Sequence, residues 1–408
     1  MPPVIRPVRP QEVTEFMTVL ETATGRHATA QFLENAATAY DFDRTLAAFD
    51  GGTMVGGTAS ELIELTVPGP VTVPAAKIAL TGLLPTHRKK GIASLFFREQ
   101  LPDLQRRGDL VAVLTTSQSG VPARHGFGVA TRAMAIDLSP SRQSRRGDES
   151  SVGVRMVDQP EAKRTLPAIF EQHRRTQPGQ VSRSKVFWEK WFSDPPLLRI
   201  GPSERFVVLA GSRSGDCVGY LTYRLSYGPL RERPVDSLFV EDLIALNSEA
   251  HRAFWAYCLD FDQAAQVRAW NLTVDDPICW MPSTMRSAEV TSVRPFLYLR
   301  LIDVPAALEA RRYAGGDAIV LQVDDPVLTD NAGRYLLRSD GVQASCERTD
   351  EPWDVALSVT ELAAAYLGDV DFTTLARAGR ARCSRADGLA RLDAMFASRP
   401  APWTVTDW

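Results

Sequence analysis

The residues best suited to chemistry lie in one short segment, LLPTHRKKGIAS, at residues 83–94. Arg88, Lys89 and Lys90 bring three positive charges together, and Gly91 lets the backbone turn tightly and a ligand approach closely. A helix that begins directly after such a turn presents unpaired N–H groups and the positive end of its dipole. Together these features predict a binding site for a diphosphate.

The same segment matches the pattern Arg-x-x-Gly-x-Ala, with Arg88, Gly91 and Ala93 at the fixed positions. This is the pattern of acetyltransferases that bind acetyl-CoA. The alternative is a charged, capped helix start with no ligand. Two other phosphate-binding loops are excluded, because the sequence contains neither GxxxxGK[ST] nor GxGxxG.

The elements around this segment must hold it in place. The mostly apolar run KIALTGLL predicts a strand over 77–84, and the apolar stripe that follows predicts a helix over 89–106. A second buried strand is predicted over 110–115. Upstream, Asp50-Gly51 between two apolar runs predicts a hairpin. This order of elements predicts a mixed α/β sheet with helices packed on its faces.

Breaks in composition divide the chain into three blocks. The polar stretch 139–153, rich in Ser and Arg, predicts a surface linker. We therefore predict domains over 1–140, 154–295 and 296–408. The second block repeats the order of elements of the first, which indicates a structural duplication without a residue-level repeat. The chain ends in an extended, proline-containing tail in which Trp403 and Trp408 are expected to be buried.

Composition narrows the class of protein. The 408 residues carry a net charge of −3, which gives no reason to expect nucleic acid or an anionic membrane as a partner. No apolar run approaches the roughly 18 residues of a membrane span, and the N-terminus shows no apolar signal segment. A cytoplasmic location is the resulting expectation. The five cysteines and five histidines are scattered, so neither a disulfide framework nor a metal site is expected.

Several stretches make a resemblance specific. They are LTVPGPVTVPAA (65–76), LPTHRKKGIASLFFREQL (84–101), VAVLTTSQSG (111–120), RHGFG (124–128) and LRLIDVPAALEARRY (299–313). With these stretches the chain resembles, over its whole length, the actinobacterial enhanced intracellular survival (Eis) family of GCN5-related N-acetyltransferases. The terminal aromatic residue preceded by an acid also matches.

The resemblance implies two tandem GCN5-type acetyltransferase folds, the second without a cofactor site, and a C-terminal sterol-carrier-protein-like α/β domain. It implies an enzyme that uses acetyl-CoA to acetylate a primary amine on a small molecule, by direct attack in a ternary complex. It also implies assembly into homo-hexamers. The implied acetyl-CoA contacts are Thr81, Gly82, Leu83, Arg88, Lys89, Lys90, Gly91, Ile92, Ala93, Ser94, Ser117 and Gln118.

The resemblance implies two catalytic roles, a base and an acid, and only the base has a matching group in this sequence. In the family a chain-terminal carboxylate takes the proton of the amine, and here that group is the α-carboxylate of Trp408. The alternative is a tail that only packs. The family's proton donor to the leaving thiolate is a tyrosine, but Pro122 stands at its position, and Phe127 replaces a second tyrosine. Proline has no proton to give, so a slow reaction with water as donor is expected, with His125 as a candidate substitute.

The acceptor and the level of activity stay open at this point. Asp407 keeps an acidic residue that relatives use toward polycationic acceptors, whereas the stretch after Glu21 carries Arg26 and His27 and no acid. This favours an acceptor with a neutral or negative group beside its amine. The alternative to an active enzyme is a weak or inactive pseudoenzyme that binds CoA or a lipid, or serves as a scaffold.

Overall fold

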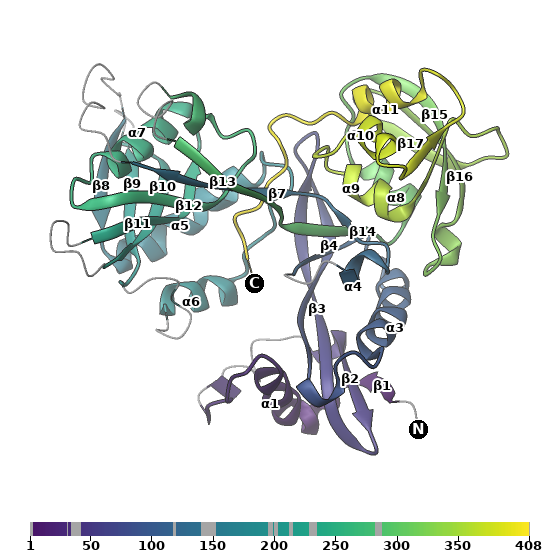
Figure 1. Cartoon of the computed structure of the whole chain (residues 1–408), viewed down its shortest axis with the longest axis horizontal. Helices are drawn as coiled ribbons and strands as arrows, with labels where there is room; N and C mark the ends of the chain where they lie inside the picture. The colour runs from purple at the N-terminus through teal and green to yellow at the C-terminus, as the bar shows by residue number, and fades with distance from the viewer. Residues whose placement is uncertain are drawn as a thin grey trace. The chain divides into compact units, whose positions relative to one another are not determined.

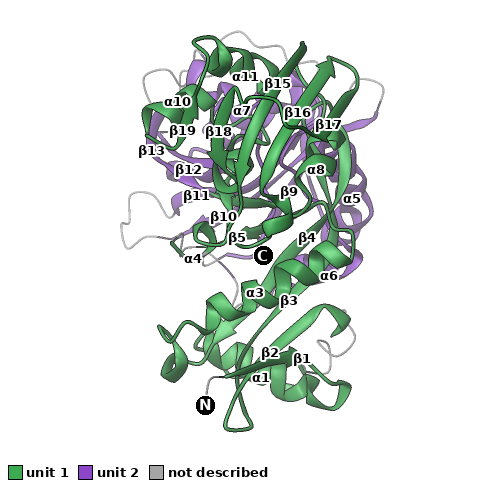
Figure 2. Ribbon diagram, turned by 90° about the vertical axis from the view of Figure 1, so that its right-hand side faces the viewer, with its two compact units in different colours: residues 1–131, 296–399, 407–408 green, residues 132–295, 400–406 purple. Residues whose placement is uncertain are grey.

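The structure is a computed structural model, and its elements are shown in Figure 1. It describes residues 3–30, 32–33, 42–116, 120–139, 152–194, 199, 203–211, 215–227, 235–281 and 288–407. The chain forms two compact units (Figure 2). Unit 1 consists of residues 1–131, 296–399 and 407–408, and unit 2 of residues 132–295 and 400–406.

The first sheet of unit 1 has seven strands in the order β1-β2-β3-β4-β5-β14-β6. Their bounds are β1 Val4–Pro7, β2 Thr45–Asp50, β3 Thr53–Val67, β4 Val71–Leu83, β5 Val111–Thr115, β14 Leu297–Leu301 and β6 Gly128–Val129. Neighbouring strands are antiparallel except β4 and β5, which run parallel. The helix between them, α3 (Ile92–Arg106), makes the crossover that a parallel pair requires.

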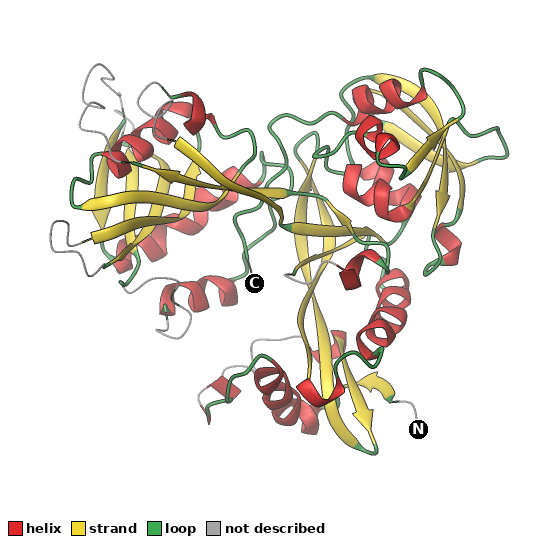
Figure 3. Ribbon diagram, viewed as in Figure 1, coloured by secondary structure: helices red, strands yellow, loops and turns green. Residues whose placement is uncertain are grey.

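Helices cover both faces of this sheet. The adjacent residues Ala47 and Ala48 of β2 point to opposite faces. Ala47 shares a buried cluster with Phe16 of α1 (Val13–Ala23), whereas Ala48 shares one with Phe96 of α3. The first sheet is therefore the middle layer of an α/β/α arrangement (Figure 3). The small helix α4 (Gly120–Ala123) precedes β6.

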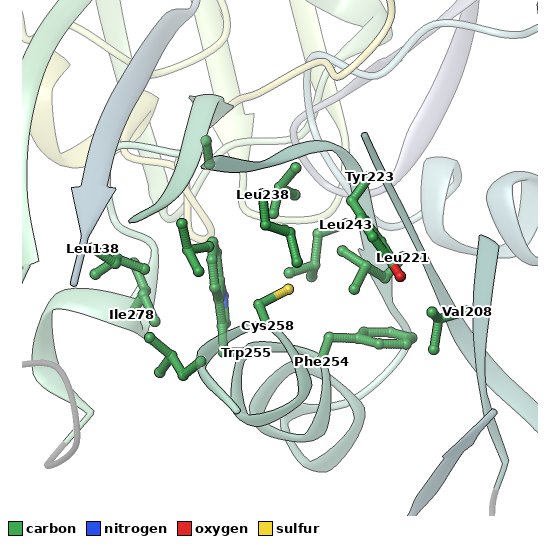
Figure 4. Close-up of a cluster of buried hydrophobic side chains, with 14 of the residues drawn as sticks. Leu138, Val208, Leu221, Tyr223, Leu238, Leu243, Phe254, Trp255, Cys258 and Ile278 are labelled. Atoms are coloured by element: carbon green, nitrogen blue, oxygen red, sulfur yellow. The ribbon is translucent and has the colours of Figure 1, made fainter. Parts of the chain in front are cut away.

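The second seven-stranded sheet belongs to unit 2 and has the order β13-β7-β12-β11-β10-β9-β8. Its strands are β7 Arg132–Leu138, β8 Gly153–Val157, β9 Phe206–Gly211, β10 Cys217–Ser226, β11 Val235–Ala245, β12 Ala264–Leu272 and β13 Ala288–Pro295. The helices are α5 Gln159–Arg174, α6 Lys185–Ser193 and α7 Ser248–Leu259. In Figure 4, Phe254, Trp255 and Cys258 of α7 lie against Leu221, Leu238 and Leu243 of the sheet, and all belong to one buried cluster.

The third fold has a five-stranded sheet in the order β17-β16-β15-β18-β19 and is part of unit 1. Its strands are β15 Gly316–Asp324, β16 Gly333–Asp340, β17 Ala344–Arg348, β18 Val355–Ser358 and β19 Ala381–Cys383. Its helices are α8 Val304–Ala310, α9 Val359–Ala365, α10 Phe372–Arg377 and α11 Gly388–Phe396. Helix α9 packs directly on β6, where a Cβ on Gly128 would meet the carbonyl oxygen of Thr360 at 2.2 Å. The third fold thus packs against β6 of the first sheet through helix α9.

Strand pairing differs from the predicted boundaries of 140 and 296. Strand β7 precedes residue 140 but pairs with β12 and β13 in the second sheet. Strand β14 follows residue 296 but lies between β5 and β6 in the first sheet. Backbone groups of a sheet need partners, and each sheet takes its partners from a strand distant in sequence. Local periodicity carries no record of such long-range pairing.

Within the described ranges, no helix is long and apolar enough to cross a membrane. Those same ranges contain no group of three or more His, Cys, Asp or Glu residues placed to hold a metal ion. All five cysteines are free thiols, and Cys258 and Cys346 are buried.

Candidate active site

The parallel strands β4 and β5 separate along their length. Their pairing runs from Ala75 opposite Val111 to Lys77 opposite Val113. Strand β4 continues to Leu83 and stays paired with β3 on its other side. Past Lys77, the described part of the chain supplies no partner from β5, so this edge of β4 offers backbone groups to a ligand. An extended, amide-containing ligand can add to such an edge as an extra strand would.

A bulge lies within the open part of β4. Gly57 of β3 faces Gly82, but Ala59 faces Ala79, so an extra residue stands in β4 between these pairs. The hydroxyls of Thr58 and Thr81 are 2.8 Å apart across the bulge. Bulges bend a strand and take backbone groups out of the ladder, and they are frequent next to active sites.

Arg88 anchors the loop that follows β4. Its Nε donates to the carbonyl oxygen of Leu83 at 3.2 Å, and its Nη2 donates to the carbonyl oxygen of Ala23, the last residue of α1. A cation at a helix C-terminus is favourable for the helix dipole. Arg88 therefore anchors the loop that leads to α3 onto both β4 and α1. Its guanidinium donates hydrogen bonds to carbonyl groups of the protein itself.

The loop itself forms an anion cradle at the start of α3. Lys89 has φ of 62° and Gly91 has φ of 82°, so both adopt the left-handed conformation. Gly91 is the N-cap residue, no side chain caps the helix, and the preceding lysines are exposed. A Cβ on Gly91 would meet nothing within 4 Å, so the approach is open. Uncapped N–H groups, a left-handed turn and flanking lysines suit a diphosphate. The described residues of this loop therefore fit the cofactor predicted from the sequence.

In the second acetyltransferase-like fold, a side chain caps the helix end that corresponds to the start of α3. Helix α7 follows β11 as α3 follows β4, but its N-cap residue is Asn247. The Asn247 side chain accepts a hydrogen bond from the backbone N–H of Ala250 at 2.8 Å. Because the protein's own side chain already satisfies this helix end, it offers less to an anion than α3 does.

His125 contacts the cofactor loop from the turn after α4. Its Nε2 lies 3.1 Å from the hydroxyl of Ser94, and its ring stacks on Phe97 with centroids 4.8 Å apart. The side chain is 5% exposed, and burial, followed by the charges of Arg98, Arg300 and Arg124, lowers its pKa below 6.5. His125 is therefore neutral at pH 7. A neutral imidazole hydrogen-bonded to Ser94 is better suited to positioning the loop than to donating a proton.

Pro122 lies in α4, at the position where the family resemblance places the proton donor. Its carbonyl oxygen accepts hydrogen bonds from the backbone N–H groups of His125 (2.9 Å) and Phe127 (3.2 Å). The residue has a structural role in this turn, and its ring carries no dissociable proton. Phe127 is buried in the core beside Phe97.

Asp407 of the tail is anchored at the end of β5. Its Oδ1 accepts a hydrogen bond from the hydroxyl of Thr115 at 3.1 Å. Arg26 forms a two-contact ion pair with Glu21, with Nε–Oε2 and Nη2–Oε1 distances of 2.8 and 3.1 Å. Three predicted site residues, Ser117, Gln118 and Trp408, lie outside the described residues.

The structure thus brings together the cradle, Ser94, His125 and the open edge of β4. It adds residues that were not predicted from the sequence, namely Thr115, Thr58, Phe97 and the carbonyl group of Ala23. Phe97 and Thr115 stand in stretches that carry the family resemblance, but the resemblance assigned them no role, and each of the four acts through a partner distant in sequence. Only the fold could identify them.

Comparisons with known proteins place the chain in a family. Two models described as an acetyltransferase (GNAT) domain match residues 4–130 and 179–301, and a sterol carrier protein domain matches residues 304–405. The N-acetyltransferase Eis of Mycobacterium tuberculosis is 31% identical over 378 residues, covering 87% of this chain and 89% of the relative. The chain belongs to the Eis family of GCN5-related N-acetyltransferases.

Other relatives agree with this assignment. An uncharacterized N-acetyltransferase of Streptomyces coelicolor is 35% identical over 354 residues, covering 86% of this chain and 84% of the relative. The crystal structure of Eis1 from Mycobacterium abscessus superimposes with a TM-score of 0.86 over the full length of both chains, at 28% identity. The predicted fold class, two acetyltransferase folds and a sterol-carrier-like domain, is confirmed. As an Eis-family protein this chain is an N-acetyltransferase.

Proposed function

We propose that this enzyme transfers the acetyl group of acetyl-CoA to a primary amine on a small molecule, by direct attack in a ternary complex. The observation that carries the proposal is the uncapped, left-handed turn at Gly91, directly beyond the open edge of β4. When bound, acetyl-CoA supplies the acetyl thioester. The cradle at Lys89–Ser94 is assigned to its diphosphate, and residues Thr81–Leu83, with Ser117 and Gln118, to the rest of the cofactor.

The α-carboxylate of Trp408 is the proposed base. An amine must lose a proton before it attacks a thioester, and a positioned carboxylate can take that proton. The support is the hydrogen bond between Thr115 and Asp407, which anchors the preceding residue at the end of β5, beside the open edge of β4. In the proposed step the amine nitrogen forms a bond to the carbonyl carbon, and the carbon–sulfur bond breaks.

No protein acid takes part in the proposed step. Pro122 has no proton, and His125 is neutral because burial and nearby arginines lower its pKa. A thiol has a pKa of about 8.5, so its thiolate is a tolerable leaving group that water can protonate. A positioned acid contributes about 10²–10⁴-fold, and we expect this enzyme to be slower than a tyrosine-bearing relative by a factor within that range.

We propose an acceptor with a neutral group beside its amine. The ion pair between Arg26 and Glu21 compensates the positive charge that follows α1 in the sequence. The carboxylate of Asp407 accepts a hydrogen bond from the hydroxyl of Thr115. A panel of amines of equal size and charge from +1 to +4 tests this proposal. A best substrate that carries three or more positive charges contradicts it.

Two measurements test the proposed reaction. Calorimetric titration of the full chain with acetyl-CoA is expected to give one micromolar site per chain, and no binding would refute the cofactor assignment. Binding without turnover of any acceptor would favour the pseudoenzyme alternative. The sharper test replaces the α-carboxylate of Trp408 by a carboxamide through protein ligation. This variant keeps every side chain, so the base role predicts a kcat lower by about 10²–10⁴-fold with an unchanged Kd for acetyl-CoA.

The remaining proposals concern organisation. We assign the cofactor site to the domain at 1–140, a non-catalytic role to 154–295, and a sterol-carrier-like fold to 296–408. Strand β7 pairs in the second sheet and strand β14 in the first, across these boundaries. A homo-hexamer and a cytoplasmic location remain predictions from the family resemblance and the sequence. Sedimentation analysis of the purified chain tests the assembly.

A further inference from the structure

The second acetyltransferase fold repeats the strand separation of the first. Strands β11 and β12 form its parallel pair, with pairing from Val235 opposite Ala264 to Val240 opposite Ala269. Both strands continue beyond this point, to Ala245 and Leu272. In the first fold the corresponding separation is where we place the cofactor. In the second fold, the chain's own residues 400–406 lie with the same unit.

Asn271 binds this tail from the separated end of β12. Its Nδ2 donates to the carbonyl oxygen of Thr404 at 3.0 Å, and its Oδ1 accepts from the indole Nε1 of Trp403 at 3.0 Å. Both polar atoms of one buried side chain are thus used on the tail. The Trp403 indole belongs to a buried cluster that also contains Ile244, on β11 beyond its last pair with β12.

The loop between α5 and α6 holds the other side of the tail. The backbone N–H of Trp403 donates to the carbonyl oxygen of Pro178 at 2.8 Å. The fully buried Gln180 accepts through Oε1 from the hydroxyl of Thr404 at 3.2 Å and from the N–H of Val405 at 3.4 Å. These contacts hold two backbone N–H groups and one hydroxyl of the tail.

Arg183 fixes the last tail residue of unit 2. Its Nη1 pairs with Asp242 of β11 at 2.8 Å, and its Nε donates to the hydroxyl of Thr406 at 3.0 Å. The guanidinium lies 4.2 Å from the ring centroid of Phe170 and 5.0 Å from that of Trp188. The ion pair with Asp242 and the two aromatic rings therefore hold the guanidinium of Arg183 in the position from which it donates to Thr406.

These contacts define one register. Trp403, Thr404, Val405 and Thr406 are 6%, 0%, 4% and 3% exposed. A shift of one residue in an extended segment turns its side chains to the opposite faces. The shift would leave buried groups of Asn271, Gln180 and Arg183 without partners on the tail. We call the four residues that hold the tail the tail groove, namely Asn271, Pro178, Gln180 and Arg183, and these contacts fix the register of residues 403–406.

We propose that the second acetyltransferase fold is a peptide-binding module whose ligand is the chain's own segment 400–406. It holds that segment against the separated end of β12 and fixes its register, and so sets how many residues extend from it to the chain's α-carboxylate. Its catalytic consequence rests on the proposed function, because it requires the α-carboxylate of Trp408 to act in the reaction. The tail-binding role does not depend on that step.

Two single-glycine insertions in the full chain test the proposal. One is placed between the exposed residues Arg399 and Pro400, before the groove, and the other between Thr406 and Asp407, after it. Both lengthen the tail equally, so each is the matched control for the other. The readouts are kcat, Kd for acetyl-CoA, melting temperature, and hydrogen exchange at the amides of Trp403 and Val405.

If the groove sets the register, the upstream insertion keeps kcat within threefold and keeps both amides protected. The downstream insertion also keeps protection and Kd but makes kcat at least about 100-fold lower, because a misplacement of about 1 Å already has that effect and one added residue lengthens the chain by up to about 3.5 Å. Loss of protection, or an equal loss of kcat, in the upstream variant overturns the proposal. Protection in both variants with full kcat in both supports the groove and refutes the base role of Trp408, so the two failures are distinct.

Discussion

Arg300 of β14 and Asp325, which follows β15, form an ion pair at 2.6 Å in which both side chains are 0% exposed. The pair joins the first acetyltransferase sheet to the sterol-carrier-like fold within unit 1. Asp325 also accepts from the backbone N–H groups of Val327 and Leu328 and from Asn331. Because Arg300 also lies beside Gly126, next to His125, this pair reaches from the third fold to the neighbourhood of the cofactor loop.

Removal of one partner of this pair should destabilise unit 1 strongly. Asp325→Ala leaves the guanidinium of Arg300 buried without a counter-charge, which costs about 3–5 kcal/mol. The double variant Arg300→Met with Asp325→Leu removes both charges and should lose much less. Urea unfolding of the two variants checks this. Equal losses would show that the charge matters less than the hydrogen bonds that Asp325 accepts from Val327, Leu328 and Asn331, which both variants lose.

Gly91 should be intolerant of β-branched side chains for a conformational reason. A Cβ there meets nothing within 4 Å, but its φ of 82° costs an L-residue about 1–2 kcal/mol. We expect Gly91→Val to raise the Kd for acetyl-CoA about tenfold, whereas Gly91→Asn should raise it less, because asparagine enters this conformation more readily. Calorimetric titration measures both. Equal effects of Val and Asn would point to side-chain bulk instead.

His125→Phe separates positioning from acid catalysis. Phenylalanine keeps the stacking on Phe97 but removes the hydrogen bond to Ser94, which is worth about 1 kcal/mol. We expect about a fivefold weaker Kd for acetyl-CoA, with kcat changed less than twofold. If kcat instead fell at least 100-fold while Kd stayed unchanged, His125 would be the proton donor.

The pH profile of kcat should rise to a plateau without a descending alkaline limb. A catalytic acid produces such a limb when it loses its proton, and neither Pro122 nor the neutral His125 can supply it. Steady-state rates from pH 6 to 10 with saturating acetyl-CoA check this, with a repeat assay at pH 7.5 after each incubation. A reversible decline between pH 8 and 10 would reveal an acid elsewhere in the site.

His173 should make the tail groove sensitive to acid. Burial lowers its pKa from 6.5 to about 4, and its ring lies edge-on to Trp403. Between pH 4 and 6.5 the unfolded chain binds more protons at His173 than the folded chain does. The contribution of His173 to stability is therefore complete above pH 6.5 and is lost as the pH falls toward 4. The loss is at most about 3 kcal/mol.

The matched control for this prediction is His173→Phe, which keeps an aromatic ring beside Trp403 but does not titrate. Exchange protection of the Trp403 amide should fall from pH 7 to pH 5 in the parent chain and stay level in the variant. The same fall in both proteins would assign the effect to other groups.

The cofactor loop was predictable from the sequence because its chemistry is local. The strand predicted over 77–84 and the helix over 89–106 are β4, Val71–Leu83, and α3, Ile92–Arg106. The helix begins later than predicted because Lys89 and Gly91 take left-handed conformations that no right-handed helix contains. Trp403 is buried, as its place in a proline-rich tail indicated.

The long-range partners were not predictable in this way. The sequence of β14, LYLRL, has the apolar pattern of any buried strand. That pattern does not indicate that β14 pairs with β5. The hydrogen bond between Thr115 and Asp407 joins residues 292 positions apart. A local contact was missed as well, because Arg26 pairs with Glu21 only five residues before it, whereas the sequence alone shows an isolated charge.

The place of β14 between β5 and β6 has a consequence for the order of synthesis. The first sheet lacks an internal strand until the ribosome has made residues 132–295, the whole second fold. At about 5–20 residues per second, this delay is on the order of ten seconds. During that time the edges of β5 and β6 have no partner, and an open apolar edge attracts other strands. The first domain should therefore close late, and the nascent chain should depend on chaperones until Leu301 emerges.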